Sequence, residues 1–294
     1  LLAPCSTLRS LALRDIDIPD LSAFSIFAAL DALRSRRSVP CPTGSDPGPV
    51  ARVGEAGRRD RLGSGRSAGR AAVFAEMTEV GMKLYSYYRS SAAYRVRIAL
   101  NIKQISYEII PIHLVRNGGE QYANEYVDIN PQALVPTLEV DGEFITQSSA
   151  IIEYLEERYA SPSLLPESLI DRAQVRAMVQ LIACDVHPLN NLRVLKYIEG
   201  TLGHNEKIKI DWYHHWLRRG FDAIETLLEN SSCDEYCFHD QVTMAELFLV
   251  PQVYNAIRFN FDMIPYPRIN RIFHHCIQLS AFSDAAPEQQ PDAE

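Results

Sequence analysis

The chain has 294 residues, which is enough for one large domain or for two domains of ordinary size. Hydrophobic residues make up 47% of it and charged residues 22%, as is typical of globular proteins in water. The formal net charge of −8 gives no indication of a nucleic-acid partner, and no apolar run reaches the roughly 18 residues that span a bilayer. We therefore expect a soluble, cytoplasmic protein that binds neither nucleic acid nor a membrane.

The cysteine pattern argues against a metal or dithiol centre. None of the six cysteines belongs to a C-x-x-C pair, which excludes a zinc ribbon and a dithiol redox motif. Cys233 and Cys237 have a spacing that a metal accepts, but no second Cys/His pair accompanies them. The pattern predicts free thiols in a reducing compartment and no metal site.

Residues 1–81 differ in composition from the rest, because they contain no Lys, His, Asn, Gln, Tyr or Trp. Ser38–Arg70 is rich in Pro, Gly, Ser and Arg, which is typical of disorder. An Arg-rich leader resembles a transit peptide, but acidic residues are scattered through it and transit peptides lack them. We expect residues 1–81 to be a disordered leader outside the fold, and Met77 or Met82 to be plausible starts.

Residues 82–162 alternate between strand and helix signals. Lys83–Tyr88 has a strand pattern, and a helix follows from Ala92 with Ser91 as a suitable N-cap. Ile105–His113 is a second strand, and a polar helical stretch extends to about Asp128.

A hairpin and a helix complete this region. Asp141-Gly142 separates two alternating runs, which is a strong signal for a tight turn between strands. Ser148 is placed to cap a helix over Ala150–Tyr159. The order β-α-β-α-β-β-α predicts an α/β layer domain.

Strand signals stop after this point, and residues 167–283 are predicted to be all-helical. Apolar residues recur at helical spacing over Val175–Val186 and Tyr213–Leu228. Thr243 and Glu246 form a capping box whose helix extends to about Ile257 despite Pro251. Residues 284–294 are expected to be a tail.

The chain resembles the zeta class of glutathione transferases from Met82 to Phe282, and the leader does not. The resemblance rests on a set of segments that occur in order: Tyr85–Ser91, Tyr94–Leu100, Val135–Leu138, Gln147-Ser148, Ile151–Glu156, Val242–Leu247 and Val250–Val253. It implies a thioredoxin-like N-terminal domain over residues 82–162 and an all-α C-terminal domain over residues 167–283, with glutathione as cosubstrate.

The resemblance also implies a set of glutathione-binding residues, which are Ser90, Ser91, Gln121, Val135, Pro136, Gln147, Ser148, His187 and Asn191. The implied catalytic residues are Ser90, Ser91 and Arg95, and Ser90 supplies the key hydroxyl, because a hydroxyl at a helix N-terminus stabilises a thiolate. The alternative is that Ser90 is only a turn residue and Ser91 the cap.

Other assignments have alternatives as well. The family pattern makes Pro136 cis and turns the Val135 backbone towards glutathione, whereas a proline here also suits the start of an edge strand. Gln121 is expected at the glycyl end of glutathione, or on a solvated helix face. His187 replaces a glutamine found in some relatives, and Ala92 replaces a cysteine, so the effects of both departures stay open.

The second substrate is expected to be a small dicarboxylate, held by Arg258 and Arg89, with Arg95 beside the nucleophile. Each of these arginines could instead form a surface ion pair of little energetic value. The implied reaction is cis–trans isomerisation of maleylacetoacetate to fumarylacetoacetate in tyrosine and phenylalanine catabolism, with transferase side activity, in a homodimer. The alternatives are a maleylpyruvate isomerase, a general zeta-class transferase, or a non-catalytic interaction module of the same fold.

Overall fold

A computed structural model describes residues 81–229 and 233–294 of the chain. All of them belong to the second of two units of the chain, Ala68–Glu294. The predicted leader therefore lies outside the described residues, apart from Gly81. No helix in the described residues is both long and apolar enough to cross a membrane.

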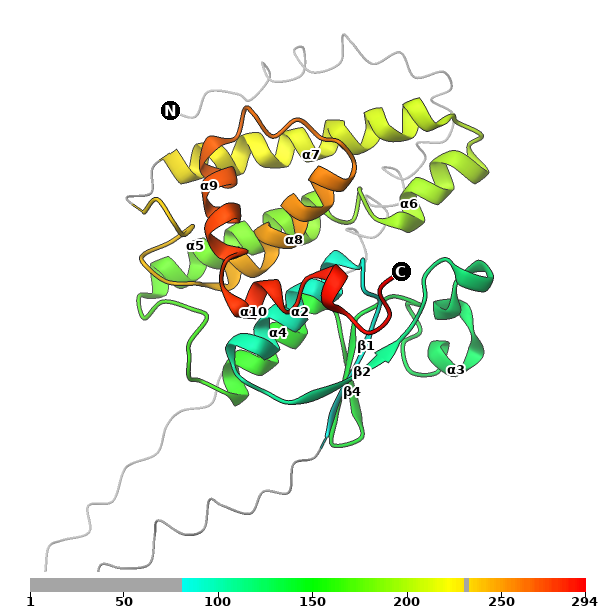
Figure 1. Cartoon of the computed structure of the whole chain (residues 1–294), viewed down its shortest axis with the longest axis horizontal. Helices are drawn as coiled ribbons and strands as arrows, with labels where there is room; N and C mark the ends of the chain where they lie inside the picture. Colours follow the sequence, from blue (N-terminus) through cyan, green and yellow to red (C-terminus); the bar gives the residue numbers. More distant parts are fainter. Residues whose placement is uncertain (1–80, 230–232) are drawn as a thin grey trace, which may run out of the picture. The chain divides into compact units, whose positions relative to one another are not determined.

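The first domain is built on a four-stranded sheet (Figure 1). Its strands are β1 (Met82–Ser86), β2 (Tyr107–Pro111), β3 (Thr137–Val140) and β4 (Glu143–Thr146), in the spatial order β2-β1-β3-β4. β1 and β2 are parallel, while β3 is antiparallel to both β1 and β4. This mixed sheet with its helices confirms the predicted thioredoxin-like α/β fold.

The β3–β4 hairpin has the turn that its sequence predicts. Asp141 and Gly142 both have positive φ angles, 54° and 82°. Two consecutive residues in this region define the tight turn whose twist matches antiparallel strands, and glycine is the residue best suited to it. The hairpin therefore pairs Val140 directly with Glu143.

Helices α2 (Ser91–Ile102) and α4 (Ser148–Arg158) pack against each other beside the sheet. The predicted helix ending near Asp128 is wrong as one element, because the chain forms three short pieces there. These are the 3-10 helices η2 (Arg116–Gly118) and η3 (Glu120–Tyr122) and the four-residue α3 (Asn124–Val127). The left-handed conformations of residues 117–119 interrupt the helix.

Both predicted N-caps of this domain are one residue too late. The N-cap of α2 is Ser90, whose Oγ accepts a hydrogen bond from the Ala93 N–H at 3.2 Å. The N-cap of α4 is Gln147, and it makes no side-chain capping bond. Ser91 and Ser148 are instead the first residues of their helices, so their hydroxyls are available for other partners.

The second domain contains helices and no strand within the described residues, which confirms the all-α prediction. Its elements are α5 (Leu169–Gln180), η4 (Leu181–Val186), α6 (Leu192–Lys196), η5 (Tyr197–Thr201), α7 (Glu206–Glu229), α8 (Met244–Arg258), α9 (Pro267–Cys276), α10 (Ser280–Ser283) and η6 (Pro287–Gln289). Helix α8 packs against α5 and α9, and it also packs on α2 of the first domain.

Helix α8 begins with the predicted capping box. The Glu246 carboxylate accepts hydrogen bonds from the backbone N–H of Thr243 and from that of Cys237, both at 2.6 Å. Burial raises the pKa of Glu246, although these hydrogen bonds oppose the shift. The box ties the start of this largely buried helix to the loop before it.

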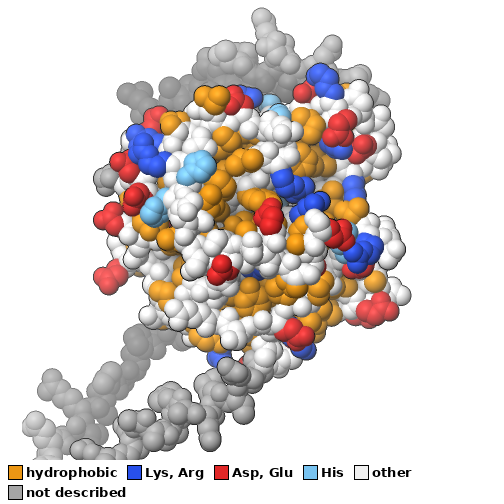
Figure 2. Space-filling model, in the orientation of Figure 1, with side chains coloured by type: hydrophobic (Ala, Val, Ile, Leu, Met, Phe, Trp, Pro, Cys, Tyr) orange, Lys and Arg blue, Asp and Glu red, His pale blue; other side chains and the backbone are white. Residues whose placement is uncertain are grey.

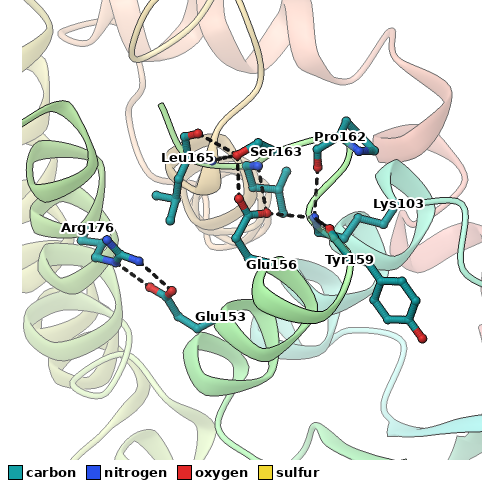
Figure 3. Close-up of polar contacts among 9 residues, drawn as sticks. Lys103, Glu153, Glu156, Tyr159, Pro162, Ser163, Leu165 and Arg176 are labelled. Carbon is teal, nitrogen blue, oxygen red and sulfur yellow. Dashed lines mark hydrogen bonds and ion pairs between the residues drawn. The ribbon is translucent and has the colours of Figure 1, made fainter. Parts of the chain in front are cut away.

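A buried ion pair joins α2, α4 and the chain between the domains (Figure 3). Lys103 Nζ lies 2.8 Å from Glu156 Oε2 and also donates to the carbonyls of Tyr159 and Pro162. The same carboxylate accepts from Ser163 Oγ at 2.6 Å and from the Leu164 N–H at 3.0 Å. The Lys103 side chain has no exposed surface, so its charge depends on these partners.

We expect Lys103→Met to lower the free energy of unfolding by about 3–5 kcal/mol, because it leaves a buried carboxylate without its cation. Urea unfolding followed by circular dichroism measures this change. The control is Arg176→Met, which breaks the pair between Arg176 and Glu153 in the same view, with side chains that are 39% and 34% exposed. That substitution should cost about 0–1 kcal/mol. Equal losses in the two variants would contradict the assigned role of Lys103.

Candidate active site

A cleft separates the two domains, and two adjoining pockets make it up. The pockets share five lining residues: Leu134, Val135, His187, Asn191 and Arg193. The first pocket contains the N-terminal end of α2 and the C-terminal end of α8, while the second contains the N-terminal end of α4. The cleft is thus open to the N-termini of two helices, which favour anionic groups.

The two serines that open α2 have different surroundings. Ser90 is partly exposed in the first pocket, and its Oγ accepts the capping bond from Ala93, which leaves the hydroxyl proton available to a ligand. Ser91 is only 7% exposed, and its hydroxyl is 3.4 Å from the carbonyl of Pro251 in α8. The Ser90 side chain is therefore accessible from the cleft, whereas the Ser91 hydroxyl is directed to α8 in the second domain.

Arg95 is a buried cation that borders the second pocket. It is 1% exposed, its Nη1 donates to Ser148 Oγ at 3.3 Å, and its guanidinium lies 4.4 Å from the centre of the Phe248 ring. Its Nε and Nη2 have no hydrogen-bond partner within the described part of the chain. Burial lowers the pKa of Arg95 to about 9, so the group remains charged at neutral pH. A buried cation with unpaired donors suits an anionic ligand group.

Gln147 and Ser148 line the second pocket opposite the β3 end of the sheet. Gln147 has φ +70°, a conformation that is uncommon for a residue with a side chain and that clusters at ligand-binding positions. Its side-chain amide donates to Gln132 Oε1 at 2.6 Å. Val135 borders both pockets, and the Val135–Pro136 peptide bond is cis, as predicted.

Gln121 reaches the first pocket from η3. It is 4% exposed, and its side-chain oxygen has no hydrogen-bond partner among the described residues. Gly119 makes this position possible, because a Cβ there would lie 2.6 Å from Gln121 Nε2 and the glycine has φ +118°. The solvated helix face considered from sequence is therefore wrong for Gln121, which is buried.

His187 borders both pockets and is half-buried, directly after η4. Burial, followed by the positive charges of Arg95 and Arg193, lowers the pKa of His187 to about 3. The imidazole is thus neutral at physiological pH, so it donates a hydrogen bond at one nitrogen and accepts one at the other. Asn191 also borders both pockets and caps α6 through the Arg193 N–H at 3.0 Å.

Arg89 and Arg258 meet at the first pocket from opposite domains. Arg89 lies over the Tyr88 ring at 4.8 Å, and Arg258 donates to Asn255 Oδ1 at 3.0 Å. In the described part of the chain, neither forms a salt bridge within 4.0 Å, so the alternative of a surface ion pair does not apply here. Both guanidinium groups remain available to an anion.

The cleft as a whole is cationic. Its lining includes Arg89, Arg95, Arg193, Lys196 and Arg258, and the residues that line its two pockets include no Asp or Glu. Elsewhere the chain carries a net negative charge, and acidic and basic side chains are interspersed on the face drawn in Figure 2. Such a local field raises the concentration of anionic ligands in the cleft.

Comparisons with known proteins agree with this geometry. Residues 84–163 match the family model of the glutathione S-transferase N-terminal domain. A probable maleylacetoacetate isomerase of Vibrio cholerae is 50% identical over 211 residues, which are 71% of this chain and 97% of that protein. The chain belongs to the zeta class of glutathione S-transferases. A solved zeta-class relative, the holo structure of a bacterial maleyl pyruvate isomerase, has a TM-score of 0.70 with 42% identity, and the match covers 72% of this chain and all of the other.

Another solved relative contains bound ligands. The maleylacetoacetate isomerase of Methylobacterium extorquens, with bound malonate and glutathione, has a TM-score of 0.69 and 37% identity. That match covers 72% of this chain and 99% of the relative. In this zeta-class chain, the predicted residues Ser90, Ser91, Gln121, Val135, His187, Asn191, Arg89 and Arg258 line the first pocket. Arg95, Pro136, Gln147 and Ser148 line the second.

Sequence reasoning missed Arg193, Lys196 and Asn190 as cleft residues. Arg193 and Lys196 lie on the short helix α6, and Asn190 is 4% exposed with neither amide atom hydrogen-bonded in the described residues. The sequence signal was weak, because a five-residue helix does not reveal which of its faces is directed to the cleft.

The mapped residues contain no group of three or more His, Cys, Asp or Glu side chains that could hold a metal ion.

The low pKa of His187 predicts a specific pH dependence of stability. Between about pH 6.5 and pH 3 the unfolded chain binds a proton at this position that the folded chain does not, so stability falls as the pH falls. Above pH 6.5 the group has no such effect. We expect His187→Gln to lose less stability than the unsubstituted chain on going from pH 7.5 to pH 5, by up to about 2 kcal/mol.

Urea unfolding at several pH values measures the effect. The control is His204→Gln, which changes an exposed histidine of the second domain. Parallel pH profiles for the unsubstituted chain and His187→Gln would contradict the predicted shift.

Proposed function

We propose that the chain catalyses the glutathione-dependent cis–trans isomerisation of maleylacetoacetate to fumarylacetoacetate. The observation that carries this proposal is a cleft lined by five cations and no carboxylate next to a serine at a helix N-terminus. The substrate is a dicarboxylate with a cis double bond conjugated to a carbonyl. Its charge suits the cleft, and its chemistry requires a reversible nucleophile.

The unpaired polar atoms of the cleft fit glutathione. Arg95 offers two unpaired donors beside Ser148 and the N-terminus of α4, which suits the γ-glutamyl carboxylate. Gln121 offers an unpaired amide oxygen in the adjacent pocket, which suits the peptide N–H of the glycyl residue of the tripeptide. Between them, the backbone of Val135 borders both pockets and suits the cysteinyl peptide.

Bound glutathione supplies a thiol nucleophile that adds to the double bond, permits rotation and leaves again. The residues of the chain prepare this thiol, because only the thiolate is nucleophilic. Ser90 donates its free hydroxyl proton towards the sulfur, and the N-terminal N–H groups of α2 add positive potential. Arg89 and Arg258 hold the carboxylates of the second substrate, and Arg193 and Lys196 contribute to the field from α6.

Isomerisation of maleylpyruvate is the second candidate function. The solved maleyl pyruvate isomerase that resembles this chain supports it, and both substrates are dianions that suit the same cations. Parallel absorbance assays with the two acids, each with and without glutathione, distinguish the activities. The higher kcat/KM identifies the preferred substrate, and no turnover of either acid would contradict an isomerase function.

We also propose that the protein is a cytoplasmic homodimer. Exposed apolar side chains occur on both domains, including Phe144 in β4 and Leu169 and Ile170 in α5, and a second copy could cover them. Cys184 and Cys276 form no disulfide, which suits a reducing compartment. Light scattering that gives the mass of one chain would contradict the dimer, and cell fractionation tests the location.

Arg258→Ala should raise KM for the dianionic substrate about tenfold, since a charge-assisted hydrogen bond is lost. KM for a neutral electrophile, and the affinity for glutathione, should change little. Steady-state kinetics with both electrophiles measure the difference. Arg219→Ala is the control, because Arg219 is an exposed arginine on α7 outside the cleft. Equal losses with both electrophiles would show that Arg258 acts through folding.

Substitution of the two adjacent serines should have different effects on the rate and on the pKa of the bound thiol. Ser90→Ala should lower kcat steeply and raise the pKa of bound glutathione by about 1–2 units, because it removes the hydroxyl beside the sulfur. Ultraviolet absorbance of the bound thiolate against pH measures this pKa. Ser91→Ala should cost about 1 kcal/mol of stability through its lost bond to Pro251, with a small effect on rate.

Ser90→Thr is the matched control, because it retains a hydroxyl and a capping oxygen. It should recover part of the rate and of the low thiol pKa. An unchanged thiolate titration in Ser90→Ala, with a shifted one in Ser91→Ala, would reverse the two assignments.

A further inference from the structure

The C-terminal residues Pro287–Glu294, here called the strap, return to the first domain and line a separate pocket next to the cleft. Figure 1 shows the C-terminal segment in red next to α2 and β1. Glu288, Ala293 and Glu294 line a pocket together with Arg89 and Arg258, the two arginines that also line the first pocket of the cleft. The C-terminal residues, which the sequence predicts to be a tail, therefore line a pocket with Arg89 and Arg258, the two arginines proposed to hold the substrate.

Several polar contacts anchor the strap. Glu288 accepts a hydrogen bond from the Tyr254 hydroxyl, and Glu294 pairs with Arg116. Gln290 is 7% exposed and donates to the carbonyls of Asp284 and Ala286, at 3.0 and 2.8 Å. These bonds fix the conformation of the strap between α10 and the loop after β2.

The strap holds the backbone just before the catalytic serine. The Tyr88 N–H donates to Asp292 Oδ2 at 3.0 Å, across 204 residues of sequence. The Tyr88 carbonyl accepts from Arg97 Nη2 at 3.0 Å. Both polar groups of the Tyr88 backbone are therefore held by side chains, two residues before Ser90.

Arg97 links this loop to the start of the C-terminal segment. It is fully buried, and its Nη1 donates to Ser86 Oγ at 3.2 Å while its Nε donates to the Ala285 carbonyl at 2.9 Å. The Ser90 N–H in turn donates to the Tyr87 carbonyl at 2.9 Å. The turn that carries Arg89 and Ser90 is thus fixed from α2 on one side and from the strap on the other.

We propose that Asp292 is a positioning residue for the reaction. By holding the Tyr88 N–H, it keeps the Ser90 hydroxyl directed at the glutathione sulfur and Arg89 at the substrate. This inference rests on the proposed function, because it concerns the same site. A displacement of about 1 Å at a reacting group is enough to reduce a rate by up to about a hundredfold.

The test compares Asp292→Ala with Asp292→Asn in the full chain. Asn retains an oxygen that accepts from the Tyr88 N–H, whereas Ala does not. We expect Asp292→Ala to lower kcat about tenfold and to raise the pKa of bound glutathione, with KM for glutathione nearly unchanged. Asp292→Asn should recover most of both. Asp284→Ala is the matched control, because it removes an exposed carboxylate at the end of α10, shortly before the strap, that does not contact the loop.

A second measurement does not depend on activity. Hydrogen–deuterium exchange of the Tyr88 amide should become faster in Asp292→Ala and stay unchanged in Asp284→Ala. Faster exchange with kcat and the thiol pKa unaltered would overturn the positioning role. Unaltered exchange would overturn the contact itself.

These outcomes are distinct from a failure of the proposed function. If the unsubstituted chain turns over neither dicarboxylate with glutathione, the proposed reaction is wrong, and the exchange result still decides whether the strap holds the loop. If the unsubstituted chain is active and Asp292→Ala is equally active, only the inference about Asp292 fails.

Discussion

Three buried cations organise this structure, two on α2 and one at its C-cap, because each must find partners for its charge. Arg95, Arg97 and Lys103 are 1%, 0% and 7% exposed. A buried charge without partners costs several kcal/mol, so each position restricts what can surround it. Lys103 interacts with Glu156 and with two carbonyls at the domain junction. Arg97 donates to three groups, which include the Tyr88 carbonyl just before the turn that carries Ser90.

Arg95 differs from the other two because its partners within the chain are incomplete. It has one hydrogen bond, to Ser148, and two donors without a partner in the described residues. A buried charge needs hydrogen-bonding or charged partners. At Lys103 the chain supplies them and the fold is stabilised, whereas at Arg95 a bound anion would complete them. In a zeta-class transferase this links the folding of α2 to the binding of the tripeptide carboxylate that we propose.

The electrostatics of the cleft follow from contributions of both domains. Arg89 and Arg95 come from the first domain, while Arg193, Lys196 and Arg258 come from the second. Because no acidic residue lines these pockets, a protein with a net charge of −8 still presents a positive site to a dicarboxylate. Helix α8 fixes the position of Arg258 relative to the first domain, since the helix is buried against α2 and ends at Arg258.

The sequence by itself determined the features that depend on neighbours along the chain. Hydrophobic periodicity gave the strands and helices, Asp141-Gly142 gave the hairpin, and the Thr243–Glu246 box gave the start of α8. A series of short motifs gave the zeta class and the candidate residues at the two helix N-termini. Tertiary structure decided that Ser90 rather than Ser91 caps α2, because the Ser91 hydroxyl is directed to Pro251 in another domain. It also brought Arg193 and Lys196 into the cleft and Asp292 to the Tyr88 amide. The Ser91–Pro251 and Tyr88–Asp292 contacts join residues 160 and 204 positions apart, and the position of Arg193 and Lys196 depends on which face of a short helix is covered. Only the packing of the folded chain specifies such contacts.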